Sequence, residues 1–231
     1  SEVRKRNFYG KKNRNITYYG MKINDNVINE IFDDLKTKSN YKKRYNEIKK
    51  FNQKNKFKKK GIAITPVKFG ISFTTIHLNQ AGALVHVYTD GSVHMNHGGI
   101  EMGQGTHTKI AQLVANSFGL PYKKVQISST NTSKVPNTSA SAASSTTDLN
   151  GAATLNAVSK IKSNLNKFIK KKYKILSKTE PLYKNGNLYI GNRIFNFEQV
   201  IKDAYLNRIS LSSSGFYSTP KINFDKKTFK G

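Results

Sequence analysis

The stretch 81–151 constrains the fold more than any other part of this 231-residue chain. Two runs of alternating apolar residues flank Asp90-Gly91, and this pattern predicts a β-hairpin with a two-residue primed turn. The second run leads into a loop, 97–105, with four glycines around Gln104. Glycines allow positive φ and let the main chain approach a ligand closely. A helical repeat follows and stops at Gly119, so we expect a strand, this glycine loop and a helix in succession.

A second polar loop precedes another predicted helix. After a short strand expected at 125–127, residues 128–145 are mostly Ser, Thr, Asn and Ala, and we call this segment the hydroxyl loop. A helix is predicted from Thr146, with Ser144 or Ser145 as N-cap. Its expected apolar face comprises Leu149, Ala152, Leu155, Val158, Ile161, Leu165 and Phe168. Two polar loops that each lead into a helix N-terminus can hold an extended, phosphate-bearing ligand without a charged side chain.

The other patterns predict scaffold. Short amphipathic helices are expected at 27–35, with Asp25 or Asn26 as cap and Ile31 and Leu35 on the apolar face, and at 41–51 after Ser39. The remaining predictions are a strand at 61–75 interrupted at Pro66, a hairpin at 188–195, a helix at 198–207 and a strand at 209–217.

Several long segments together resemble one family. They read KFGISFT, GALVHVYTDGSVHMNHGGIEMGQGTHTK and NTSKVPNTSASAAS, with EVRKRNFYG near the start and LSSSGFYSTPKI near the end. The chain is thereby similar to the molybdenum-binding subunit of the xanthine dehydrogenase and aldehyde oxidase family. The resemblance implies an α/β (α+β) fragment of the molybdopterin-binding region, with mixed strands and packed helices. Residues 1–59 would form a helical connecting segment, and 60–231 an incomplete second molybdopterin-binding domain.

The resemblance also implies site residues. The cofactor-binding positions it carries over are Gly103, Gln104, Ala142, Ala143 and Ser144. Phe73 and Thr74 match the substrate pocket, where an aromatic ring packs on a planar heterocycle. No side chain is implied as a direct ligand of the molybdenum, because the pterin dithiolene and inorganic groups hold it. The catalytic glutamate base is expected after residue 231 and the substrate-binding arginine before residue 1, so no catalytic residue is assigned within the chain.

The implied activity is that of a xanthine dehydrogenase component. It would hydroxylate hypoxanthine to xanthine and xanthine to urate with oxygen derived from water, using molybdenum-molybdopterin. Electrons would pass to NAD through 2Fe-2S clusters and FAD on a partner subunit, so a hetero-oligomer is expected, and this fragment alone should be inactive. The alternatives are an aldehyde oxidase-type molybdenum hydroxylase, a basic nucleic-acid-binding module and a decayed, non-catalytic gene product.

Composition excludes other classes. The formal net charge is +27 and the pI is about 10.1, which by itself suggests a nucleic-acid partner. The lysines are spread over all surface-like stretches, however, and the motif-rich part is nearly uncharged, so we expect no nucleic acid. The chain has no cysteine, so any iron–sulfur cluster must lie on a partner. No apolar run reaches membrane-spanning length and no signal peptide precedes the chain, so a cytoplasmic protein without a membrane partner is expected.

Two tempting sites are rejected on the residues themselves. All five histidines lie between His77 and His107, but the only nearby carboxylate suited to complete a metal site is Glu101. Glu101 has no neighbour that would bring its pKa towards neutrality, so we do not assign it as a general base.

Overall fold

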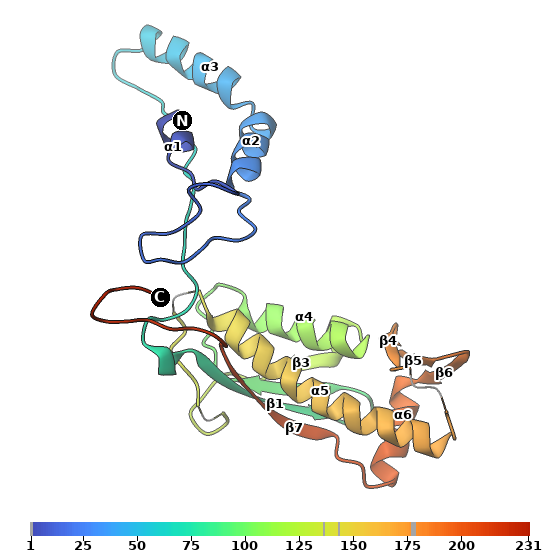
Figure 1. Ribbon diagram of the computed structural model, residues 1–231. Helices are drawn as coiled ribbons and strands as arrows, with labels where there is room; N and C mark the ends of the chain where they lie inside the picture. The colour runs from blue at the N-terminus through green and yellow to red at the C-terminus, as the bar shows by residue number, and fades with distance from the viewer. Residues whose placement is uncertain (1, 136, 143, 177–178) are drawn as a thin grey trace. The chain divides into compact units, whose positions relative to one another are not determined.

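The computed structural model describes residues 2–135, 137–142, 144–176 and 179–231, and it contains two compact units (Figure 1). One unit comprises 1–69 and 224–231, and the other comprises 70–223. The helices are α1 (Glu2–Arg6), α2 (Ile28–Lys38), α3 (Tyr41–Lys54), α4 (Thr106–Phe118), α5 (Thr146–Lys172) and α6 (Phe197–Leu206), with 3-10 turns η1 (Ile76–Leu78) and η2 (Tyr122–Lys124). The strands are β1 (Gln80–Val87), β2 (Val93–His97), β3 (Val125–Ile127), β4 (Leu182–Lys184), β5 (Asn187–Ile190), β6 (Arg193–Asn196) and β7 (Ser212–Ser218). The predicted mixture of strands and packed helices is confirmed.

The larger unit is built on a four-stranded sheet of order β3-β2-β1-β7. Strand β1 pairs antiparallel with β2, where Ala83 faces His97, and antiparallel with β7, where Gln80 faces Ser218. Strand β3 runs parallel to β2. Because of these directions, β1 begins at the end of the sheet where β2 and β3 finish.

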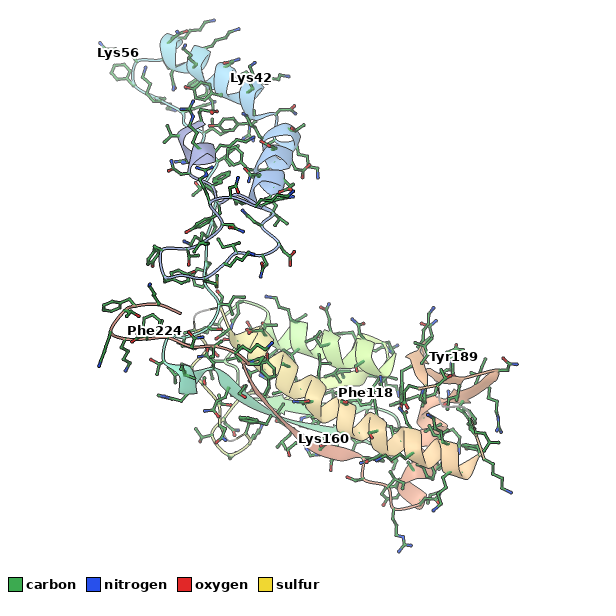
Figure 2. All side chains as sticks on the ribbon, viewed as in Figure 1. Lys42, Lys56, Phe118, Lys160, Tyr189 and Phe224 are labelled. Carbon is green, nitrogen blue, oxygen red and sulfur yellow. The ribbon has the colours of Figure 1, made fainter. Side chains whose placement is uncertain are left out.

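Helices α4 and α5 lie side by side on this sheet and enclose its core (Figure 1). From Ala83 to Val87 alternate residues of β1 are buried, which is the pattern of a strand with one face on a core. Phe118 at the end of α4 is fully buried, with its ring centroid 6.3 Å from that of Tyr183 and 5.7 Å from that of Phe197 (Figure 2). This aromatic cluster joins the core to the small antiparallel sheet β4-β5-β6 and to α6.

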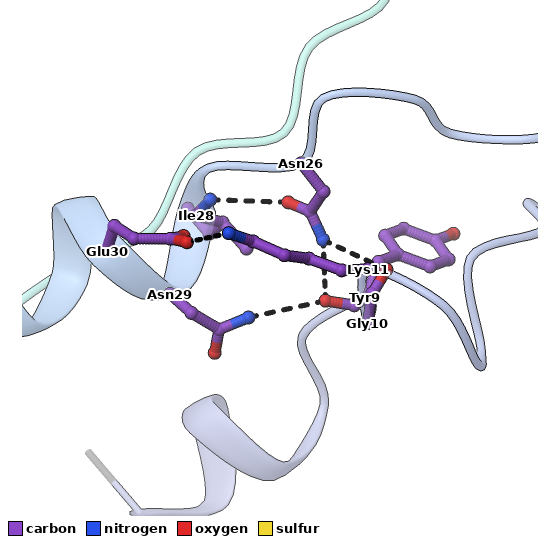
Figure 3. Close-up of polar contacts among 7 residues, drawn as sticks. All are labelled: Tyr9, Gly10, Lys11, Asn26, Ile28, Asn29 and Glu30. Carbon is purple, nitrogen blue, oxygen red and sulfur yellow. Dashed lines mark hydrogen bonds and ion pairs between the residues drawn. The ribbon is translucent and has the colours of Figure 1, made fainter.

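In the smaller unit, polar contacts connect the segment after α1 to the start of α2. The side chain of Asn26 donates to the carbonyl of Tyr9 at 2.6 Å and accepts from the Ile28 N–H at 3.2 Å at the start of α2 (Figure 3). Lys11 and Glu30 form an ion pair beside it. The buried residue of α2 is Phe32, not Ile31 or Leu35 as predicted, because this helix packs on Phe8 through its other side.

The predicted hairpin forms, but its predicted turn is wrong. Tyr88 and Ser92 are the last hydrogen-bonded pair, so the loop has three residues instead of two. Among the loop residues 89–91, only Gly91 has a positive φ, at 73°, whereas a type I′ turn requires positive φ at two positions. The Asp90 carboxylate instead accepts from the Ser92 N–H at 3.0 Å, which favours the longer loop.

Other predictions hold with corrections. The helices predicted after 97–105 and after 128–145 are α4 and α5, and the hairpin at 188–195 is β5-β6, with β4 as an additional strand. Residues 61–75 form no strand, because they pair with no other strand and Pro66 lacks an N–H. Leu155 is 38% exposed, since α5 buries the small residues Ala153 and Ala157 instead.

Within the described residues, no helix is both long and apolar enough to cross a membrane.

Candidate functional site

Three predicted site segments adjoin the same end of the four-stranded sheet. The turn that carries Phe73 and Thr74 precedes β1, the glycine loop follows β2, and the hydroxyl loop follows β3. Helices α4 and α5 also begin at this end, after the two loops. The N-termini of both helices, which are the positive ends of their dipoles, therefore lie beside the two loops.

The glycine loop and the hydroxyl loop are joined directly. The hydroxyl of Ser141 accepts a hydrogen bond from the Ile100 N–H at 2.7 Å. The hydroxyl of Thr130 lies 3.0 Å from the carbonyl of His97 and 2.8 Å from that of Gly99, to which it donates. A Cβ at Gly98 would lie 1.6 Å from the Thr138 hydroxyl oxygen, so the loops approach closely only because this residue is glycine.

Glu101 organises the glycine loop from within. One carboxylate oxygen accepts from the N–H groups of Gly103 at 2.9 Å and Gly105 at 2.8 Å, and the other accepts from the His107 N–H at 3.0 Å. The N–H of His107 contributes most to lowering the pKa of Glu101, and the N–H of Gly105 comes next. A carboxylate with this geometry is an ionised cap of α4. Its pKa is lowered, whereas a carboxylate that acts as a general base needs a raised pKa.

Gln104 lies exposed at the tip of the glycine loop. Its amide oxygen accepts from the Met102 N–H at 2.6 Å, and its amide nitrogen donates to the Ile100 carbonyl at 2.8 Å. A primary amide has two N–H donors. One of them is used in the bond to the Ile100 carbonyl, and the second is available to a ligand. Gly103 has φ 97° and open space where a Cβ would stand.

The other predicted cofactor-binding residues lie just before α5. Ala142 and Ser144 are exposed, and Ser144 has an unusual positive φ of 52°. Ala143 is outside the described residues. Ser145 occupies the predicted N-cap position, but its hydroxyl donates to the Ala142 carbonyl at 2.9 Å and does not cap the helix.

The turn that carries Phe73 and Thr74 is fixed by a buried asparagine. Asn79, 2% exposed, accepts from the Phe73 N–H at 2.8 Å and donates to the Phe73 carbonyl at 2.9 Å. Phe73 is half-buried and Thr74 is exposed. Asn79 therefore holds this turn to the start of β1.

Unpaired polar atoms are concentrated beneath the two loops. Side-chain atoms that are buried without a partner occur on His97, Thr106, His107 and Asn150. Asn150 lies next to the glycine loop, since a Cβ at Gly99 would be 3.2 Å from its amide nitrogen. Buried polar atoms without partners are rare in folded proteins and mark places where a ligand or water completes the structure. No group of three or more His, Cys, Asp or Glu residues that could hold a metal ion occurs in the part of the chain that the structure describes.

Several residues of the site did not stand out in the sequence. In the sequence, Thr130, Thr138 and Ser141 belong to a hydroxyl-rich segment that distinguishes none of them, and no pattern marks Asn79 or His97 as contact residues. The only signal was the density of hydroxyl groups in 128–145, which does not specify which hydroxyl meets the glycine loop.

The chain matches known proteins along its whole length. A family model described as "Molybdopterin cofactor-binding domain" matches residues 34–231. The chain is 41% identical over 230 residues to "Xanthine dehydrogenase" of Oryza sativa subsp. japonica and 45% identical over 230 residues to "Xanthine dehydrogenase/oxidase" of Gallus gallus. In both cases the match covers 100% of this chain and 15% of the relative, so the chain spans only a small part of the length of these relatives.

Solved structures share the fold. The quinoline 2-oxidoreductase of Pseudomonas putida 86 superposes with a TM-score of 0.71 at 16% identity, over 95% of this chain and 30% of that chain. The aldehyde oxidoreductase of Desulfovibrio desulfuricans superposes with a TM-score of 0.64 at 16% identity, over 98% and 22%.

Proposed function

Because the chain belongs to the family of molybdopterin cofactor-binding domains, we propose that the glycine loop and the hydroxyl loop together hold the molybdenum-molybdopterin of a xanthine dehydrogenase. The observation that carries this proposal is the direct contact of the two loops through Ser141 and Ile100. The hydroxyl loop leads into the N-terminus of α5, which has no side-chain cap, so its N–H groups can bond to an extended anionic ligand.

The residues present fit such a ligand. Gly103 leaves open space at the loop tip, Gln104 has a free amide N–H, and the exposed Ala142 and Ser144 are small enough to admit a flat pterin. Ala143 belongs to the same proposed set. The bound group supplies the oxygen-transfer and redox chemistry, whereas these residues position it.

We propose that Phe73 and Thr74 contact the substrate, a purine such as hypoxanthine or xanthine. The ring of Phe73 offers a flat apolar face, and the Thr74 hydroxyl offers a hydrogen bond at the rim. Asn79 holds both residues at the sheet end from which the cofactor loops leave. In this proposal the electron acceptors are 2Fe-2S clusters and FAD on the partner, followed by NAD. The chain has no cysteine with which to ligate an iron–sulfur cluster.

Replacement of Gln104 tests the proposal. In the intact protein we expect Gln104→Ala to lower the molybdenum content and turnover, with the unfolding midpoint within a degree or two of the parent's, because the side chain is exposed. Gln126→Ala is the matched control, since Gln126 is an exposed glutamine on β3. The proposal fails if Gln104→Ala keeps full molybdenum content and full rate.

A further inference from the structure

His97 is the last residue of β2 and is 2% exposed. Its Nδ1 accepts a hydrogen bond from the Gly99 N–H at 3.0 Å. This contact spans two residues of the chain and bends the main chain at the point where the strand becomes the glycine loop. The direction of the loop is therefore set by an imidazole at its root.

The same bend is held from the other side by the hydroxyl loop. The Thr130 hydroxyl donates to the Gly99 carbonyl at 2.8 Å and lies 3.0 Å from that of His97, so the histidine and the hydroxyl act on the same two residues. Loss of the His97 acceptor would leave the Gly99 N–H buried and unpaired, while Thr130 still holds the carbonyl side. We therefore expect the main chain at the Gly99 N–H to shift towards another acceptor or water, because a buried unpaired donor is costly.

The hydrogen bond determines the protonation state of the ring. An Nδ1 that accepts carries no proton, so the neutral ring has its proton on Nε2. The pKa of His97 is lowered to about 4: burial is the main cause, the nearby His107 acts in the same direction, and Glu101 acts in the opposite direction. The ring of His107 lies edge-on at a centroid distance of 5.0 Å. A proton added at Nδ1 would face the Gly99 N–H, and two donors cannot bond to each other.

We propose that neutral His97, protonated only at Nε2, is a positioning residue that fixes the glycine loop in the conformation that retains the cofactor. This inference rests on the proposed function and extends it, because it assigns the loop conformation to a buried residue at the root of the loop. In this proposal the loop conformation depends on a hydrogen-bond acceptor at the Nδ1 position.

Three substitutions at position 97 test the proposal in the intact protein. His97→Asn places an amide oxygen where Nδ1 stands and can accept from the N–H two residues on, as asparagine does in Asx-turns. His97→Gln places its amide near the Nε2 position, and His97→Phe keeps a ring without an acceptor. His77→Asn is the control, because His77 is exposed on η1.

We expect His97→Gln and His97→Phe to speed amide exchange at Gly99 and to lower molybdenum content by roughly tenfold, as loss of a positioning partner does elsewhere. His97→Asn should keep the molybdenum content within about twofold of the parent's, since the acceptor is restored. In the parent, 15N spectra of labelled histidine should show the Nε2–H tautomer for His97 at pH 6.

Three results would overturn the proposal: an Nδ1–H or doubly protonated ring, equal loss in the Asn, Gln and Phe variants, or unchanged exchange at Gly99. A failure of the proposed function looks different. Gln104→Ala would then also keep its molybdenum, while the tautomer and the exchange at Gly99 would still follow the acceptor at position 97.

Discussion

The carboxylate of Glu101 accepts a hydrogen bond from the Gly105 N–H at 2.8 Å, immediately before α4 begins. Together with the bonds from Gly103 and His107, this contact makes an acidic side chain part of the helix cap. An ionised carboxylate at a helix N-terminus is also favoured by the helix dipole. The glycine loop is thus shaped by its own acidic residue before any ligand arrives.

We expect Glu101→Gln to loosen the loop. An amide oxygen can replace one acceptor but not the charge, so the amides of Gly103, Gly105 and His107 should exchange faster than in the parent. Hydrogen exchange read by NMR measures this, and Glu198→Gln, an exposed acid at the start of α6, is the control. Unchanged exchange at Gly105 would contradict the capping role.

A methyl group at Gly98 should separate the two loops. Its Cβ would lie 1.6 Å from the Thr138 hydroxyl oxygen and 2.4 Å from the Thr138 Cβ, so Gly98→Ala forces the loops apart at a cost of roughly 1–3 kcal/mol. Urea unfolding measures the loss. Gly70→Ala is the control, because nothing lies within 4 Å of its Cβ and its φ is not positive. Thr138→Gly in the same chain should recover part of the loss, and no recovery would mean that another contact is responsible.

The elements around the site were predictable because each carries a local signal. The apolar repeat of α4 ends at Gly119, which takes the left-handed conformation (φ 64°) expected after a helix. Alternation predicted β1 and β2. Each of these signals lies within a few residues of the structure it predicts, so one sequence is enough to read it.

The contacts that build the site were not predictable in the same way. Ser141 meets Ile100 across 41 residues of sequence, and nothing in the hydroxyl loop distinguishes Ser141 from its neighbours. Asn79 looks like an ordinary turn residue, and its burial results from packing that brings the Phe73 turn back onto it. Leu155 followed the helical repeat of α5, but the close approach of α5 to β1 and β7 selects small residues for the interface instead.

The aromatic cluster at the end of α4 should dominate the stability of the larger unit. Phe118 is fully buried between Tyr183 and Phe197, so Phe118→Ala removes a large apolar side chain and leaves a cavity. We expect a loss of about 3–5 kcal/mol in the free energy of unfolding. Phe216→Ala on β7 is the control, since Phe216 is 47% exposed and should cost clearly less. Similar losses in both variants would contradict the assignment of the core.

The stability of the protein should depend on pH through His97. The pKa of His97 is lowered in the folded state from its ordinary value of 6.5 to about 4, so the unfolded chain binds the extra proton first as pH falls. The contribution of the neutral ring is therefore complete above pH 6.5 and is lost as pH falls from 6.5 towards 4, by an amount on the order of 2–4 kcal/mol. Urea unfolding at several pH values should show this slope in the parent and in the control His77→Asn. It should be clearly smaller in His97→Asn, where the pKa of His94, also lowered by burial, still contributes. Glu101 and the other carboxylates with lowered pKa act in the same direction, but only near and below pH 4.5, so the window from pH 6.5 to 5 reports on histidine. A parent protein whose free energy of unfolding stays level across that window would show that His97 is not held neutral by the fold.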